Sequence, residues 1–125
     1  MKRHGIFVFG SNERGRHGAG AARFAADYFG AVEGQGRGRQ GQSYAIPTKD
    51  RRLRTLPLDV IHENVAQFIH YAAQHPEFWF FVTRIGCGLA GYDDEDIAPF
   101  FEGHTVNCYL DPAWIEILSG RRPAV

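Results

Sequence analysis

Two glycine-rich segments, each set between a short apolar run and a predicted helix, constrain the fold of this chain more than any other feature. The first covers residues 10–20 and follows the run 5–9, and the second covers residues 84–92 and follows the run 78–82. Because glycine has no Cβ, backbone amides in such segments can approach a ligand closely, and a following helix N-terminus adds partial positive charge. The matched pair predicts two loops that close around a phosphorylated small molecule.

Apolar runs and helical periodicity alternate along the rest of the 125 residues. We expect a loop at 30–42, strands at 6–9, 43–46, 78–83 and 105–110, and helices at 18–29, 57–75, 93–101 and 114–118, with Pro47 closing the second strand. This alternation predicts a single domain, residues 1–125, of the α/β class: a three-layer α/β/α sandwich around a largely parallel or mixed central sheet. Ligands of such sheets bind at the carboxyl ends of the strands, where both glycine-rich segments begin.

The formal net charge of zero conceals two halves of opposite charge. Residues 1–55 hold eleven Lys and Arg against four Asp and Glu, whereas the remaining residues hold three against ten. A basic half favours an anionic ligand or partner, and the segment 37–54 suggests, as an alternative function, an interaction module for protein or nucleic acid. Nucleic acid is not the favoured partner, because no aromatic residues are interleaved with the basic residues at 49–54.

Cysteine, histidine and apolar patterns point to no metal, cofactor or membrane. The two cysteines form no Cys-x-x-Cys pair, the six histidines are scattered, and the acidic run 93–96 is typical of a helix start. No apolar stretch approaches the 18 residues or so that a membrane span needs. We therefore expect a cytoplasmic protein with reduced thiols and no membrane partner.

The candidate site residues come from both glycine-rich segments. Two of them have a second interpretation: Cys87 suits a small buried filler, and Tyr92 suits either stacking on a ligand or capping the core. Asn12 and His17 are the candidates for a catalytic role, although neither segment carries a strong acid or base in an evident position. The candidate ligand-binding residues are Gly10, Ser11, Asn12, Gly18, Ala19, Gly20, Ala21, Ile85, Gly86, Cys87, Gly88, Leu89, Ala90, Gly91 and Tyr92.

These motifs resemble the macro domain family of ADP-ribose binders. The resemblance rests on residues 6–12 (IFVFGSN), 18–22 (GAGAA) and 85–92 (IGCGLAGY). Together with 46–49 (IPTK), they look most like the branch that holds the terminal ADP-ribose glycohydrolase and the antitoxins that reverse DNA ADP-ribosylation, and like small macro-like proteins of bacteria and phages. The resemblance implies that the first segment covers the distal ribose, with Asn12 facing it, and that the second holds the diphosphate.

The resemblance implies a function and leaves one alternative within the same fold. The expected function is binding of ADP-ribose or a related NAD-derived nucleotide. The alternative is a hydrolase that removes ADP-ribose from a protein, a nucleic acid or an acetyl ester, with Asn12 and His17 assisting a bound water. A covalent lysine mechanism is used in this branch, but neither glycine-rich segment contains a lysine, and the acid of the glycohydrolase's second loop falls at Ala90. The sequence therefore favours binding over hydrolysis.

Overall fold

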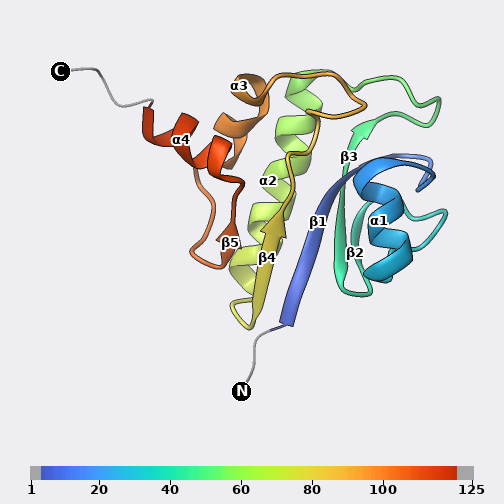
Figure 1. The fold of residues 1–125 in the computed structure, drawn as a ribbon, viewed down its shortest axis with the longest axis horizontal. Coiled ribbons are helices and arrows are strands. Elements are labelled where there is room, and N and C mark those ends of the chain that lie inside the picture. The colour runs from blue at the N-terminus through green and yellow to red at the C-terminus, as the bar shows by residue number, and fades with distance from the viewer. Residues whose placement is uncertain (1–3, 121–125) are drawn as a thin grey trace.

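The computed structural model describes residues 4–120, and these residues confirm the α/β class. One sheet of five strands is interleaved with four α-helices and one short 3₁₀ helix (Figure 1). The elements in chain order are β1 His4–Asn12, α1 Gly20–Tyr28, β2 Gly38–Gln40, β3 Ser43–Lys49, α2 Leu58–Gln74, β4 Phe78–Val82, α3 Asp94–Ile97, η1 Ala98–Phe101, β5 Cys108–Tyr109 and α4 Pro112–Gly120.

The order of the strands places both glycine-rich segments at one edge of the sheet. The order is β2-β3-β1-β4-β5, and every neighbouring pair is parallel except β2 with β3. β1 and β4 are therefore parallel neighbours, with Val8 level with Val82. Because each strand leads at its carboxyl end into a glycine-rich segment, the two segments emerge side by side. The mixed, largely parallel sheet agrees with the sequence prediction.

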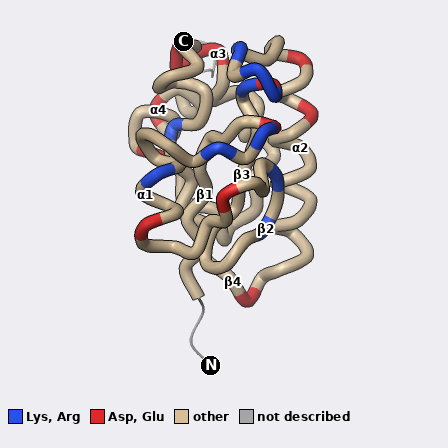
Figure 2. The backbone as a smooth tube through the Cα atoms, turned by 90° about the vertical axis from the view of Figure 1, so that its right-hand side faces the viewer, with Lys and Arg blue, Asp and Glu red and all other residues tan. Residues whose placement is uncertain are grey.

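Helices lie on both faces of the sheet, and the two faces are covered unequally. Figures 1 and 2 place α1 on one face and α2 on the other. Beneath α1 a small cluster is buried, in which Ala22 and Ala25 bring the helix close to Phe9. The other face carries the larger core, which includes Phe80 of the sheet and Trp114 of α4. Burial of this apolar surface supplies most of the stabilisation.

Two strand predictions differ from the structure for identifiable reasons. The expected loop 30–42 contains β2, which forms an antiparallel pair with β3. β3 continues through Pro47 to Lys49, and the proline is tolerated because β2 pairs with β3 only as far as Ala45.

The last strand and several of the predicted helices also differ in extent, including α4, which covers Pro112–Gly120 instead of 114–118. The strand expected at 105–110 shrinks to β5, because the Asn107 side chain donates to the carbonyls of Ala72, His75 and Phe78 and holds the chain at the end of α2. The helix expected at 93–101 divides into α3 and η1, with a proline in the first turn of η1. The first helix starts at Gly20 instead of Gly18.

Candidate ligand pocket

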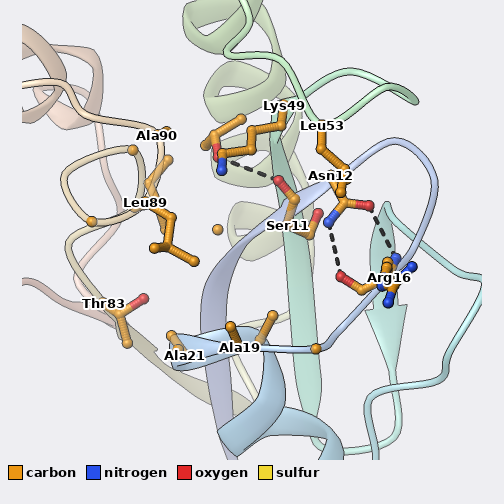
Figure 3. A pocket seen from close by; sticks show the side chains of 18 of the residues that line it. Ser11, Asn12, Arg16, Ala19, Ala21, Lys49, Leu53, Thr83, Leu89 and Ala90 are labelled. Carbon is orange, nitrogen blue, oxygen red and sulfur yellow. Dashed lines mark hydrogen bonds between the residues drawn. The ribbon is translucent and has the colours of Figure 1, made fainter.

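A pocket of about 610 Å³ opens at the carboxyl ends of β1, β3 and β4. Both glycine-rich segments line it, and we refer to them as the first loop (10–20) and the second loop (84–92). Figure 3 shows side chains from these two loops and from the end of β3 around one cavity. The predicted residues that line the pocket are Gly10, Ser11, Asn12, Gly18, Ala19, Gly20, Ala21, Ile85, Gly86, Gly88, Leu89 and Ala90.

The N-terminus of α1 forms one wall of the pocket. Ala19 occupies the N-cap position in an extended conformation, and no side chain caps the helix. The first amides of an α-helix have no partner within the helix, so at an uncapped end they remain available to an anion. Residues 18–22 all line the pocket. This wall therefore offers hydrogen-bond donors and the positive end of a helix dipole.

Asn12 lines the pocket, but its side chain is already engaged in shaping the first loop. Its Nδ2 donates to the carbonyl of Arg16 over 2.8 Å, and its Oδ1 accepts from the Arg16 amide over 3.0 Å (Figure 3). Neighbouring Ser11 donates through Oγ to the carbonyl of Gly36. The polar Ser-Asn pair thus fixes the path of the loop.

His17 lies outside the pocket lining and is buried beneath the first loop. Its Nε2 is 3.0 Å from the carbonyl oxygen of Gln35 and 3.2 Å from Oε1 of Gln40, and its ring meets Phe9 edge to face. With two acceptors at Nε2, the proton resides on that nitrogen. The histidine joins the first loop to residues 35–40 and does not face the pocket as an acid or base would.

The second loop is anchored by Asp94 of α3. The Asp94 carboxylate accepts from Nε and Nη2 of Arg84 over 2.8 and 2.6 Å, and from Nε1 of Trp114 over 2.7 Å. These bonds, led by that from Arg84, lower the pKa of Asp94 to about 2. Burial, followed by the neighbouring Asp94, raises the pKa of the Cys87 thiol to about 12. A thiol of that pKa stays protonated at neutral pH and is a poor nucleophile.

Three predicted site residues of the second loop do not line the pocket: Cys87, Gly91 and Tyr92. Tyr92 donates through its hydroxyl to the carbonyl of Leu56 over 2.7 Å, and its amide donates to the carbonyl of Gly86 over 2.9 Å. Of its two predicted roles, the structure therefore favours a packing and anchoring role over stacking on a ligand.

The structure adds lining residues that the sequence analysis did not include. Lys49 is the most informative, because it supplies a primary amine from the end of β3 and its side chain extends into the cavity (Figure 3). Within residues 4–120, neither Lys49 nor Arg16 forms an ion pair with a carboxylate. The added lining residues are Arg16, Ala22, Thr48, Lys49, Leu53, Thr83 and Arg84.

The topology explains how Lys49 reaches the site. β3 is the parallel neighbour of β1 on the side opposite β4, and Lys49 is level with Asn12. The carboxyl ends of parallel strands share one edge of the sheet. The IPTK motif, residues 46–49, lies at the carboxyl end of β3 and was therefore the sequence signal for Lys49. Lys49 lies beyond the predicted strand, which ends at Pro47, whereas β3 continues to Lys49.

The basic residues of segment 37–54 are divided among several partners. Arg37 donates to the side chains of Asn64 and Gln67 on α2, and Arg39 lies over the ring of Phe78. Figure 2 shows the Lys and Arg positions distributed over separate loops, with Asp and Glu among them. Arg51, Arg52 and Arg54 remain exposed, and Arg51 lines a second pocket together with Arg37 and Glu13.

The fold and the pocket define an α/β protein with a cavity at the carboxyl edge of its sheet, lined by both glycine-rich loops and by Lys49 and Arg16. No family model matches the chain, and neither curated proteins nor solved structures give a match. Within residues 4–120, no cluster of His, Cys, Asp and Glu is suited to hold a metal ion. None of the helices in that range has the length and apolar character required to cross a membrane.

Proposed function

We propose that this protein binds ADP-ribose or a related NAD-derived nucleotide in the pocket between the two loops. One observation carries the proposal: the uncapped N-terminus of α1 and the second loop enclose a cavity that is lined by two cations without ion-pair partners, Lys49 and Arg16. A volume of about 610 Å³ lies within the range of roughly 300–1,000 Å³ typical of small-molecule sites. The choice of ADP-ribose among possible nucleotides rests on the resemblance of the motifs to macro domains.

The pocket divides into regions that suit different parts of such a ligand. The α1 amides, Gly88 and the two cations suit the diphosphate, because phosphate oxygens are strong acceptors and carry negative charge. Gly88 has no heavy atom within 4 Å of where a Cβ would lie, so the backbone there is open to a ligand. The first loop beside Asn12 suits a ribose, as the resemblance implies.

Calorimetric titration with ADP-ribose, AMP and NAD tests the proposal. We expect micromolar binding that is tightest for ADP-ribose. Gly88→Glu should abolish binding, because it places a carboxylate where the diphosphate would lie, whereas Gly103→Glu, outside the pocket, should bind normally. Unchanged affinity in a folded Gly88→Glu variant would reject this placement, and absence of binding to all three nucleotides would reject the function.

Lys49 favours a second candidate function, hydrolytic removal of ADP-ribose from a conjugate. The branch that the motifs resemble uses a covalent lysine mechanism, and the pocket does contain a lysine, although neither loop does. Lys49→Arg separates the two roles of the amine, because arginine keeps the charge for a phosphate but is not a nucleophile at neutral pH. If the protein is a hydrolase, this variant should bind ADP-ribose and release none from ADP-ribosylated protein or DNA. Wild-type protein that releases none would leave binding as the function.

A further inference from the structure

Leu53 has a backbone conformation that leucine rarely adopts, and it lies in the wall of the pocket. It is the one non-glycine residue with positive φ among residues 4–120, at 64°. For a residue with a side chain this region is sterically unfavourable, whereas glycine enters it freely. The side chain is 39 % exposed and lines the cavity.

A dense set of hydrogen bonds holds Leu53 in this conformation. Its amide donates to the carbonyl of Asp50 over 2.9 Å, and the Asp50 amide donates to the carbonyl of Arg54 over 2.8 Å. The Asp50 carboxylate accepts from the amides of Arg52 and Arg54 over 2.8 and 2.9 Å. The turn 50–54 therefore imposes the strain and directs Leu53 towards the pocket. Strain that the surroundings enforce in this way is characteristic of functional positions.

A second exposed leucine, Leu89, lines the same cavity on the opposite wall. Leu89 of the second loop is 72 % exposed and also lines the pocket. In Figure 3, Leu53 and Leu89 lie on opposite sides of the cavity. The Thr55 hydroxyl donates to the carbonyl of Ala90 over 2.9 Å and links the segment after the turn to the second loop. The segments that carry the two leucines are thus joined by a hydrogen bond.

We propose that Leu53 and Leu89 are ligand-contacting residues that grip the nucleobase of the bound nucleotide from two sides. This inference rests on the proposed function, because it assumes that a nucleotide occupies the pocket. Phosphates and ribose hydroxyls gain nothing from an aliphatic side chain, whereas the flat face of a base is the apolar surface of a nucleotide. The leucines bury their exposed surface against the base, and the pocket thereby discriminates nucleotides from phosphosugars.

Replacement of Leu53 should affect the stability of the protein and its affinity for the ligand differently. Leu53→Gly relieves the positive-φ strain, so we expect a thermal midpoint equal to that of the wild type or a few degrees higher. The same variant should bind ADP-ribose roughly tenfold more weakly, because it loses apolar contact with the base. If Leu53 served only to support the fold, its replacement by glycine would lower the thermal midpoint of the protein. Leu89→Ala should weaken binding similarly, and Ile115→Ala, an exposed aliphatic residue outside the pocket, should not.

The ligand series distinguishes a grip on the base from other contacts. ADP-ribose and AMP should lose affinity for the Leu53 and Leu89 variants, while ribose 5-phosphate and pyrophosphate should bind the variants as they bind the wild type. Equal losses for ribose 5-phosphate would overturn the assignment to the base. Wild-type affinity of both variants for ADP-ribose would overturn the inference and leave the proposed function standing. Failure of the wild-type protein to bind any nucleotide would overturn both.

Discussion

The two glycine-rich loops follow neighbouring parallel strands, yet the molecule holds them in place by different means. The first loop packs backbone against backbone on residues 30–37, where the Gly34 amide donates to the carbonyl of Gly15 over 2.8 Å. A Cβ on Gly15 or Gly36 would overlap main-chain atoms of the opposing segment. The second loop is held by side chains, chiefly by the Asp94 carboxylate. The first loop therefore depends on close backbone approach together with the neutral side chains of Ser11, Asn12 and His17, whereas the second depends on a charged side chain.

The difference shows that glycine has two separate purposes in these loops. Gly15 allows the protein to pack against itself, with φ at 77°. Gly88, whose φ is not positive, has no neighbouring atom within 4 Å of where a Cβ would lie, and it lines the pocket. A substitution at the first kind of glycine should damage the fold, and one at the second kind should affect only the ligand.

Gly36→Ala is expected to have the largest effect, because it tests the close packing of the first loop directly. The added methyl would overlap the Asn12 carbonyl oxygen, and backbone atoms can relax only by moving both segments apart. We expect a loss of about 3 kcal/mol in the free energy of unfolding, with the first loop displaced. Urea denaturation, monitored by circular dichroism, measures the change in the free energy of unfolding.

Gly103→Ala is the matched control for this substitution. Gly103 is exposed, with no neighbour within 4 Å of its Cβ position, so its replacement should change the free energy of unfolding by less than about 0.5 kcal/mol. If Gly36→Ala were as stable as this control, the first loop would not depend on close packing against residues 30–37.

The sequence predicted the outline of the fold because its periodic signals are local. The apolar run around Val8 and the amphipathic helix that includes Phe68 and ends before Pro76 can be recognised without knowledge of their neighbours. β2 could not be found in this way, since three residues within a glycine-rich stretch acquire strand geometry only by pairing with β3. β5 was overestimated because the Asn107 side chain, directly before the strand, bonds to carbonyls at the end of α2, which is distant in the sequence.

The candidate site was predictable where glycine patterns mark it and unpredictable where contacts over long sequence distances create it. Most of the predicted residues of both loops line the pocket. Leu53 gave no signal, because its exposure and positive φ arise from a turn held by Asp50. His17 was misleading, since a histidine beside a glycine-rich loop has the same local sequence whether it faces the pocket or the interior.

Asp94→Asn should have the next largest effect, and it tests the charge dependence of the second loop. The carboxylate is 19 % exposed and accepts three hydrogen bonds, two from Arg84 and one from Trp114. An amide cannot accept from Arg84 at both of its atoms, so we expect a loss of about 2 kcal/mol. Weaker ADP-ribose binding should accompany it. The deficit should shrink at high salt, unlike that of Gly36→Ala.

The pH dependence of the same variant gives an independent check. The pKa of Asp94 in the folded protein is about 2, below its ordinary value of 3.8, because Arg84 and Trp114 hydrogen-bond to the charged form. The unfolded chain therefore binds the proton first as the pH falls. The stabilisation is complete above about pH 4 and is lost between roughly pH 4 and 2. Denaturation curves of the wild type and Asp94→Asn should converge across that window, and a constant difference would exclude the carboxylate charge as the anchor.

Tyr92→Phe should have the smallest effect, because it removes a single neutral hydrogen bond from the second loop. The ring stays packed, while the 2.7 Å bond from the hydroxyl to the Leu56 carbonyl is lost. We expect a loss of about 1 kcal/mol in the free energy of unfolding, with no dependence on salt. Tyr28→Phe, at an exposed ring on α1, is the control and should be neutral. Affinity for ADP-ribose should change less than in Asp94→Asn, because Tyr92 does not line the pocket. A tenfold loss of affinity at unchanged stability would instead place Tyr92 against the ligand and restore the stacking role that its position in the sequence permits.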